Sequence, residues 1–325
     1  MKGDKKETVP ARPAYVLITA AKNESAFIPK TLDSVVNQTV LPGKWVIVDD
    51  GSQDATGSIV RHYLDRYDFI QLVSQPQPTA RNFGAKARAL RTALASLAGT
   101  GYEYIGNLDA DVSFGETFYE TLLDRFSQDP ELGISGGVIW EIHKKKWQYA
   151  PSRPDWCVGG ATHFFRRACF EDVGSGYAPL RYGGEDTVAE YCARDKGWKV
   201  TAMKDCIVYH YKPSVLISGK SWRAPYAMGR QEYHWGTGIL FETAKCLSRC
   251  VLRPLSADGY ARIFGYMGQV LTRAKRDVPD ATARIVRRQQ SRQLFGRVLG
   301  KLSSNNKRSG SELRMAAAAR ERIGP

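Results

Sequence analysis

Short apolar runs alternate with amphipathic segments through the first third of the chain. The runs cover residues 15–19, 45–48, 69–73 and 103–108. Because nearly every position in them is apolar, they are typical of strands buried on both faces of a sheet. The helices predicted between them cover residues 25–38, 54–67 and 81–98. This alternation predicts an α/β fold, with a mostly parallel sheet, right-handed crossovers and helices on both faces.

The hydrophobic pattern changes beyond residue 112. Residues 130–165 break into short extended segments, and residues 174–184 form a glycine-rich loop that precedes a helix starting near Glu185. Short strands are predicted at 198–202 and 206–211. The second part of the chain is therefore expected to be less regular than the first.

From about residue 220 the predicted elements are basic helices. Apolar residues recur there at helical spacing: Tyr260, Ile263, Phe264, Met267, Val270 and Leu271, then Leu294, Phe295, Val298, Leu299 and Leu302. The basic residues predicted on or beside the polar faces are Arg262, Arg273, Arg292, Arg297 and Lys301. We predict a flexible leader over 1–13, a folded domain over 14–219, a basic helical extension over 220–302 and a disordered tail over 303–325.

Composition narrows the class of protein. A chain of 325 residues holds one large α/β domain with an appendage, or two domains. It has no run of about 18 apolar residues, so no membrane-spanning helix is predicted. The charged residues 2–7 are not followed by the apolar stretch that a secretory signal needs. The six cysteines lack the paired spacing of a zinc site. They are expected to be reduced thiols in a cytoplasmic protein.

The positive charge lies at one end of the chain. Residues 1–219 contain 26 Lys and Arg against 26 Asp and Glu, whereas residues 220–325 contain 21 against 7. The whole net charge of +14 therefore belongs to the predicted helical extension. Such asymmetry indicates a polyanionic partner: anionic lipid, nucleic acid or an acidic glycan.

Acidic and polar groups follow several of the predicted strands. They are Asn23-Glu24, Asp49-Asp50, Asp109-Ala110-Asp111 and, later, Glu185-Asp186. The carboxyl ends of parallel strands share one edge of a sheet, so these groups are expected to converge there. Clustered carboxylates are costly without a cation, and the first domain has no basic excess to balance them. Alone, Asp109 and Asp111 also fit a solvated turn. Together with the other acidic groups at this edge, they predict a site for Mg²⁺ or Mn²⁺.

Six motifs carry a resemblance to a known family. In order they are residues 19–24 (TAAKNE), 32–38 (LDSVVNQ), 48–56 (VDDGSQDAT), 80–84 (ARNFG), 108–111 (LDAD) and 183–186 (GGED). Over residues 14–212 the chain resembles glycosyltransferase family 2, whose members have the GT-A fold. The resemblance implies an inverting, metal-dependent glycosyltransferase, with a nucleotide-binding half over 14–112 and an acceptor half over 113–219.

What the resemblance implies about the reaction is specific. A sugar would move from a UDP- or GDP-linked donor to a hydroxyl of a glycan or lipid-linked acceptor. The setting would be the synthesis of an envelope or extracellular polysaccharide or another glycan.

The family pattern assigns nucleotide-binding roles to residues of the first half. Asp50 would read the base, or act as a turn or capping residue for the next helix. Thr19 would line the nucleotide cleft, and Glu24 would contact the nucleotide or cap the following helix. Arg81 would meet the base or phosphate, or be a solvated surface residue. Asp49 is expected to be mainly structural.

The family pattern also assigns the metal site. Asp111 would ligate the ion that bridges both phosphates, and that ion would offset the charge developing on the leaving nucleoside diphosphate. Asp109 would contact the ribose or metal-bound water. His210 lies where many GT-A enzymes have a late metal-binding histidine, although a histidine after a strand also fits a structural role. Lys212 would meet the diphosphate.

The general base of the reaction would be Asp186. It would take the proton from the acceptor hydroxyl as that oxygen attacks the anomeric carbon from behind, which inverts the configuration. The structural alternative is a carboxylate that stabilises the start of a helix. Glu185 would shape the site. Trp156 and Trp222 are either sugar-stacking platforms or core aromatics.

The chain departs from the family in three places. Val112-Ser113 follows the Asp-x-Asp motif where many members have a further acid, residues 74–80 replace a Gly- and Asn-rich segment, and C-terminal transmembrane helices are missing. The basic helices either lie on an anionic membrane surface, on the cytoplasmic face, or pack on the catalytic domain.

Two other classes of protein agree less well with the sequence. A sugar nucleotidyltransferase needs a glycine-rich basic loop after the first strand, where residues 20–24 read AAKNE. A nucleic-acid-binding protein needs basic motifs interleaved with aromatic residues, which we do not find, so no nucleic acid partner is expected.

Overall fold

We describe the protein from a computed structural model. The described residues are 14–76, 84–143, 146–149, 156–174, 180–212, 222–252 and 258–295. The predicted leader, Arg81 and the predicted tail lie outside these ranges.

The first half of the chain is a parallel α/β unit, as predicted. Its elements are β1 (Tyr15–Ala21), α1 (Ile28–Val36), β2 (Lys44–Asp49), α2 (Thr56–Leu64), β3 (Ile70–Ser74), α3 (Gly84–Ala95) and β4 (Tyr104–Leu108). The strands lie side by side in the order β3-β2-β1-β4, all parallel.

Helices on both faces explain the apolar runs. Leu17, Trp45 and Ile47 pack on one face of the sheet with Ile28 and Leu32 of α1. Alternate residues of the same strands, among them Val16 and Val46, pack on the other face with α3. A strand covered on both sides needs an apolar residue at nearly every position.

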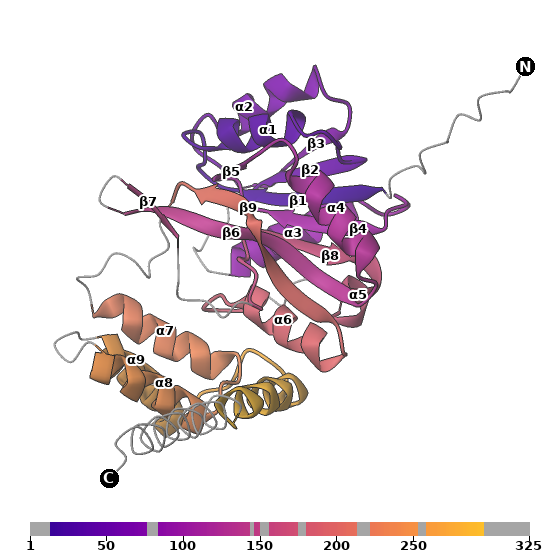
Figure 1. Cartoon of the computed structure of the whole chain (residues 1–325). Helices are drawn as coiled ribbons and strands as arrows, with labels where there is room; N and C mark the ends of the chain where they lie inside the picture. Colours follow the sequence, from indigo (N-terminus) through magenta and orange to yellow (C-terminus); the bar gives the residue numbers. More distant parts are fainter. Residues whose placement is uncertain are drawn as a thin grey trace, which may run out of the picture.

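The second half of the chain extends the same sheet. Its elements are β5 (Val112–Phe114), α4 (Phe118–Gln128), β6 (Leu132–His143), β7 (Lys146–Tyr149), β8 (Thr162–Arg166), α5 (Arg167–Asp172), α6 (Glu185–Asp195) and β9 (Lys199–His210). The strand order continues β4-β8-β6-β9-β5, with β7 paired to β6, and forms one curved sheet (Figure 1). Strand β8 runs antiparallel to β4 and β6, whereas β6 and β9 are parallel.

The long pair β6–β9 corrects two sequence expectations. Residues 132–143 form one twelve-residue strand where only short segments were predicted, and the two short strands at 198–202 and 206–211 are a single strand. The pairing passes from Gly137–Met203 directly to Val138–Ile207, so residues 204–206 bulge out of the ladder. Exposed Lys204 and Asp205 interrupt the apolar pattern at the bulge, which made one strand look like two.

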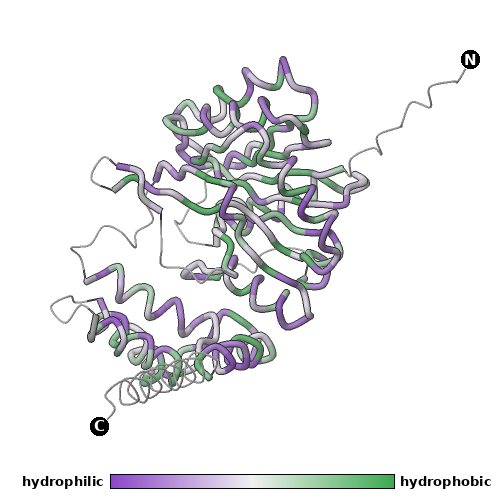
Figure 2. The backbone as a smooth tube through the Cα atoms, in the orientation of Figure 1, coloured by the Kyte–Doolittle hydropathy of each residue, from purple (hydrophilic) through white to green (hydrophobic). Residues whose placement is uncertain are grey.

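The C-terminal helices form a separate layer below the sheet (Figure 1). They are α7 (Arg223–His234), α8 (Ile239–Leu252) and α9 (Asp258–Leu271), followed by helical residues 280–295. Along these helices hydrophobic and hydrophilic positions interleave, whereas the central strands are mainly hydrophobic (Figure 2). Within the described ranges, no helix is long and apolar enough to cross a bilayer.

The prediction that Arg262 lies on or beside a polar face of its helix is wrong. Its side chain is buried, donates from Nε to Glu242 Oε1 at 2.9 Å and pairs through Nη2 with Glu232. Lys245 also pairs with both glutamates. Arg262 can face inward because two carboxylates compensate its buried guanidinium. Phe264 and Leu271 of the same helix face outward.

Glycines set the close approach of α7 and α9. A Cβ atom at Gly265 would overlap the backbone carbonyl oxygen of Tyr226, and one at Gly229 would overlap that of Arg262. Gly268, one turn further along α9, has only the Tyr226 hydroxyl nearby, at 3.9 Å.

We predict that Gly265→Ala lowers the free energy of unfolding by about 1–3 kcal/mol, because α7 and α9 must separate to admit the methyl group. Gly268→Ala is the matched control on the same helix, and it should be neutral or slightly stabilising because alanine favours the helix. Urea denaturation of both variants measures the difference. Equal stability of the two would contradict the close-packing account.

Candidate active site

The loops after β1 and β2 are joined at one edge of the sheet. The backbone N–H of Asn23 donates to Ser52 Oγ at 2.9 Å, and the Gln53 N–H donates back to Asn23 Oδ1 at 2.8 Å. Asn23 has a φ of 55°, a left-handed conformation that asparagine tolerates. The Glu24 N–H donates to Thr56 Oγ1 at 2.7 Å. These bonds bring Glu24 and Asp50 to the same edge as Asp109 and Asp111.

Pairing of the short strand β5 with β9 brings His210 to the Asp-x-Asp motif. Val112 lies opposite His210, and the Tyr211 N–H donates to the Asp111 carbonyl at 2.9 Å. His210 Nε2 is 3.4 Å from Asp111 Oδ2. One ligand atom each from Asp109, Asp111 and His210 lies within 4.8 Å of the others. Two carboxylates and an imidazole at this spacing are a fitting donor set for a divalent ion.

A buried glutamate orients the imidazole. Glu141 Oε1 lies 3.3 Å from His210 Nδ1, so the opposite ring nitrogen faces Asp111. Burial alone would lower the pKa of His210, but hydrogen bonds with Asp111 and Glu141 outweigh it and raise the pKa to about 10. The imidazolium thereby offsets the charge of the carboxylates around it. Sequence reasoning missed Glu141, because its place on β6 depends on the long β6–β9 pairing.

Two lysines approach the acidic edge from different elements. Lys86 of α3 lies 2.6 Å from Asp109 Oδ1. Burial favours the neutral amine, yet the charges of Asp109, Glu185 and Asp186 prevail and raise the pKa of Lys86. Lys212, predicted to meet a diphosphate, lies 2.6 Å from Glu24 Oε1.

Glu24 belongs electrostatically to the same cluster. Burial raises the pKa of its carboxyl group, Lys212 lowers it, and the nearby charges of Asp111 and Asp109 raise it further. Its Oε1 accepts from Lys212, and its buried Oε2 has no hydrogen-bond partner among the described residues, so the side chain does not cap α1. Of the two roles expected for Glu24, the nucleotide contact therefore stays a proposal and the helix cap is set aside.

Asp186 lies in the first turn of α6, which begins at Glu185 directly after two glycines with left-handed backbone. Gly183 and Gly184 have φ values of 78° and 92°, which glycine adopts without strain. The Thr187 N–H donates to Asp186 Oδ1 at 2.8 Å. A Cβ atom at Gly160 would lie 2.5 Å from Asp186 Oδ2, so this glycine makes room for the carboxylate.

The helical layer holds the loop in front of Asp186. A Cβ atom at Gly184 would overlap the indole ring of Trp235, so glycine and ring are in direct contact. Gln231 Nε2 donates to the Tyr182 carbonyl at 2.8 Å, and the Arg181 N–H donates to Asp277 Oδ2 at 2.7 Å. Sequence reasoning assigned no role to these helix residues, because their contact with residues 181–184 is purely tertiary.

The remaining predicted site residues are placed less favourably. Thr19 is fully buried and accepts a hydrogen bond from Trp45 Nε1 at 2.9 Å, so it has no surface with which to line a nucleotide cleft. Asp49 Oδ1 accepts from the Ser52 N–H at 2.9 Å and shapes the turn, in keeping with a structural role. Asp50 lies 3.4 Å from Lys22 Nζ. Near the start of α2, the backbone N–H of Thr56 donates to Asp54 instead of Asp50.

The sequence model of glycosyl transferase family 2 matches residues 16–176. This range contains β1–β4, the Asp-x-Asp motif and the start of the second half of the sheet. Fold and family match agree: the chain belongs to glycosyltransferase family 2 and has a GT-A fold.

Curated relatives cover only parts of this chain. It is 23% identical over 265 residues to a probable glycosyltransferase, YdaM, of Bacillus subtilis, with 75% of this chain and 59% of the relative covered. A poly-β-1,6-N-acetyl-D-glucosamine synthase of Staphylococcus epidermidis is 28% identical over 123 residues, 37% of this chain and 27% of that protein. The hyaluronan synthase of Pasteurella multocida is 31% identical over 121 residues, 37% and 12%. The chain thus spans between about an eighth and three fifths of these relatives.

Solved structures share the fold over most of the chain. A mannosyltransferase from Pyrobaculum calidifontis, in complex with GDP-Man and Mn²⁺, has a TM-score of 0.53 at 18% identity, covering 81% of this chain and 74% of that one. Residues 1–349 of S. aureus TarS, in complex with UDP-GlcNAc, give a TM-score of 0.51 at 12% identity, covering 84% of each chain. At these identities the likeness establishes the fold alone.

The contact between Gly184 and Trp235 can be tested against a matched glycine. Gly197, at the other end of α6, has a φ of 95° and no atom within 4 Å of a built Cβ. Gly184→Ala and Gly197→Ala both incur a left-handed penalty of about 1–2 kcal/mol. Only Gly184→Ala also collides with Trp235, so we expect it to lose at least tenfold more glycosyl transfer than Gly197→Ala. Equal losses of transfer and of melting temperature in the two variants would refute the contact's importance.

Proposed function

We propose that this chain transfers a sugar, with inversion, from a UDP- or GDP-linked donor to an acceptor hydroxyl. The proposal rests on the convergence of Asp109, Asp111 and His210 within 4.8 Å, at the edge where Asp186 lies in the first turn of α6. The reported relatives include a poly-β-1,6-N-acetyl-D-glucosamine synthase and a hyaluronan synthase. This supports an acceptor that is a growing glycan, free or lipid-linked.

Asp111 and His210, with Asp109, would hold a Mn²⁺ or Mg²⁺ ion. When bound, such an ion stabilises the negative charge of the departing diphosphate. The donor set fits, since hard carboxylate oxygens suit both ions and an imidazole favours Mn²⁺ over Mg²⁺. His210 would hold the ion as the neutral imidazole, because only that form is a ligand. Glu141 would keep the ring in the orientation that faces Asp111.

The side chains around the ion would bind the donor and take part in the transfer. Asp50 is proposed to read the base, and Lys86 and Lys212 to exchange their carboxylate partners for phosphate oxygens. Asp186 accepts the acceptor's hydroxyl proton while the new C–O bond forms and the bond from the anomeric carbon to the diphosphate breaks. Gly160 and Trp235 keep Asp186 in place through the contacts described above.

Two substitutions separate binding from chemistry. Asp111→Asn should weaken Mn²⁺-dependent nucleotide binding by about tenfold or more, because a charged ligand is lost. Asp186→Asn should leave donor affinity within about twofold and lower transfer by about 10²–10⁴. The measurements are calorimetric titration with UDP and GDP, and turnover of UDP- and GDP-sugars with and without acceptor oligosaccharides.

Asp205→Asn serves as the control, since Asp205 is exposed on the β9 bulge away from this edge. Unchanged transfer in Asp186→Asn would remove Asp186 as the base. If no nucleotide binds in a metal-dependent manner and no sugar nucleotide is turned over, the proposed function itself is wrong.

We also propose that α8 and α9 rest on an anionic membrane surface. Large apolar side chains are exposed at helical spacing on both helices: Leu240 and Leu247 on α8, and Tyr260, Phe264 and Leu271 on α9. The two helices pack together, and the net charge of +14 lies in residues 220–325. Exposed apolar side chains within a basic segment suit the interface of an anionic bilayer.

Vesicle flotation tests this surface. Phe264→Asp and Leu240→Asp should each lower partitioning onto vesicles rich in phosphatidylglycerol by about tenfold, because each removes an inserted apolar side chain. Leu41→Asp, at an exposed leucine of the catalytic domain, should bind like the unsubstituted chain. Equal partitioning of all three variants, or equal binding to neutral vesicles, would rule out the proposed contact.

A further inference from the structure

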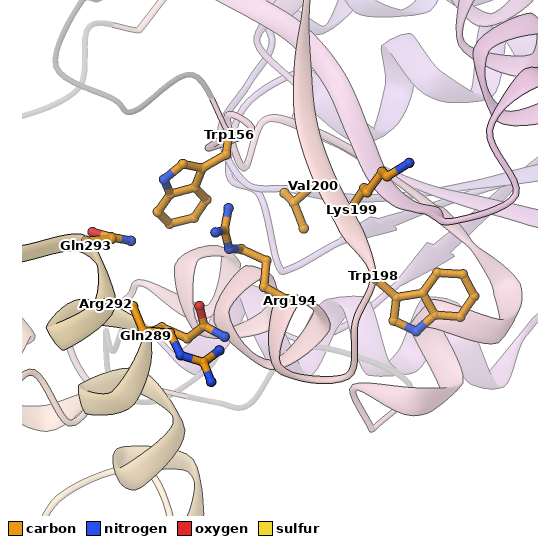
Figure 3. Close-up of a pocket in the computed structure, with 8 residues that line it drawn as sticks. All are labelled: Trp156, Arg194, Trp198, Lys199, Val200, Gln289, Arg292 and Gln293. Atoms are coloured by element: carbon orange, nitrogen blue, oxygen red, sulfur yellow. The ribbon is translucent and has the colours of Figure 1, made fainter. Parts of the chain in front are cut away.

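A cavity of about 560 Å³ lies away from the acidic edge, between the end of α6 and helical residues 280–295 (Figure 3). Its volume is in the range of ligand-binding sites. Its lining includes two indoles, two guanidinium groups and two carboxamides, which belong to Trp156, Trp198, Arg194, Arg292, Gln289 and Gln293. The catalytic domain and the helical layer therefore both contribute to it.

The lining is cationic and rich in hydrogen-bond donors. No carboxylate belongs to the set of described residues that line the cavity, whereas Arg194, Arg292 and Lys199 do. The Lys199 ammonium is already engaged by Asp129 and Glu131, at 3.1 and 2.8 Å. The two arginines are thus the groups to meet an anion here.

One buried donor in the lining, Arg194 Nε, lacks an acceptor in the described part of the chain. A buried donor without a partner is unfavourable and therefore rare in folded proteins. The Arg194 guanidinium also lies over the Trp156 ring, 4.4 Å from its centroid, and this contact helps to hold the guanidinium in place. A ligand oxygen in the cavity would satisfy this donor.

One segment of the chain runs from the cavity to Asp186, the proposed catalytic base. Residues 156–160 run beside α6: Trp156 packs on Tyr191, the Val158 N–H donates to Glu190 at 2.7 Å, and Gly160 touches Asp186. Eight residues of helix separate Asp186 from Arg194, or about 12 Å along the axis. The cavity at the end of α6 is therefore about 12 Å along the helix axis from Asp186.

We infer that this cavity binds an anionic part of the acceptor glycan, a sugar carrying a carboxylate or phosphate, several bonds away from the reacting hydroxyl. Aromatic faces suit sugar rings, carboxamides suit hydroxyl groups, and a guanidinium held in place suits a planar or tetrahedral anion. The glycan part of this inference depends on the proposed function. Ligand binding at the cavity does not, and it can be measured alone.

The full-length chain is titrated by calorimetry with an α-1,4-linked galacturonic acid hexamer, with neutral maltohexaose and with glucose 1-phosphate. The uronate hexamer should bind most tightly. Arg194→Gln should weaken it about tenfold or more, since a buried charged hydrogen bond is lost. Arg292 is exposed, so Arg292→Gln preserves the fold and should weaken binding about fivefold. Arg284→Gln, exposed on the same helix but outside the cavity, should not alter affinity.

Several results would overturn the inference. Equal affinity for the uronate hexamer and maltohexaose would remove the anionic requirement. Equal weakening in Arg284→Gln and Arg292→Gln would assign binding to general positive charge. Glucose 1-phosphate binding as tightly as the hexamer would make this a site for a small sugar phosphate. Donor turnover is measured in parallel: if it is absent, the proposed function fails, while the titrations still decide the cavity.

Discussion

Crowding of carboxylates at one edge of the sheet is the constraint on which the site depends. Four of the acids there each lie beside a cation: Asp50 beside Lys22, Glu24 beside Lys212, Asp109 beside Lys86 and Asp111 beside His210, at 2.6–3.4 Å. The four cations come from four different elements or loops, so the charge balance itself ties distant parts of the chain together. A nucleoside diphosphate and its ion bring both signs of charge, and these pairs can exchange partners without leaving any group unpaired.

The helical layer has two distinct relations to the catalytic domain. Through Trp235, Gln231 and Asp277 it contacts the loop that leads to Asp186, and through Gln289 and Arg292 it forms one wall of a separate cavity. Its own interior is held by the buried Arg262 between Glu232 and Glu242. Glu232 also accepts from Trp235 Nε1 at 3.2 Å. The ion pairs inside the layer are thus one hydrogen bond away from the ring that supports Gly184.

Features that depend on neighbouring residues could be predicted from the sequence, whereas contacts between residues far apart in the chain could not. Leu17 and Ile47 lie in runs that are apolar at every position, and this pattern requires a strand covered on both faces. The Asp-x-Asp motif was placed correctly because a strand end precedes it directly. Lys86, Glu141 and Trp235 carry no such local signal. Their places depend on the helix crossover, the β6–β9 ladder and the packing of α7, and the same side chains would be ordinary elsewhere. Arg262 was misplaced because helical spacing cannot reveal which face meets two buried glutamates.

The order of the strands has a consequence for how this protein is made. Strand β5, which directly follows the Asp-x-Asp motif, lies at the edge of the sheet, and within the described residues it pairs with β9 alone, almost a hundred residues later. A nascent chain that has left the ribosome as far as residue 198 already contains Asp109 and Asp111. It has neither His210 nor the strand that orders β5. The first half of the chain can fold early, as N-terminal units generally do, but the cluster of Asp109, Asp111 and His210 is completed only when the last strand of the sheet is added.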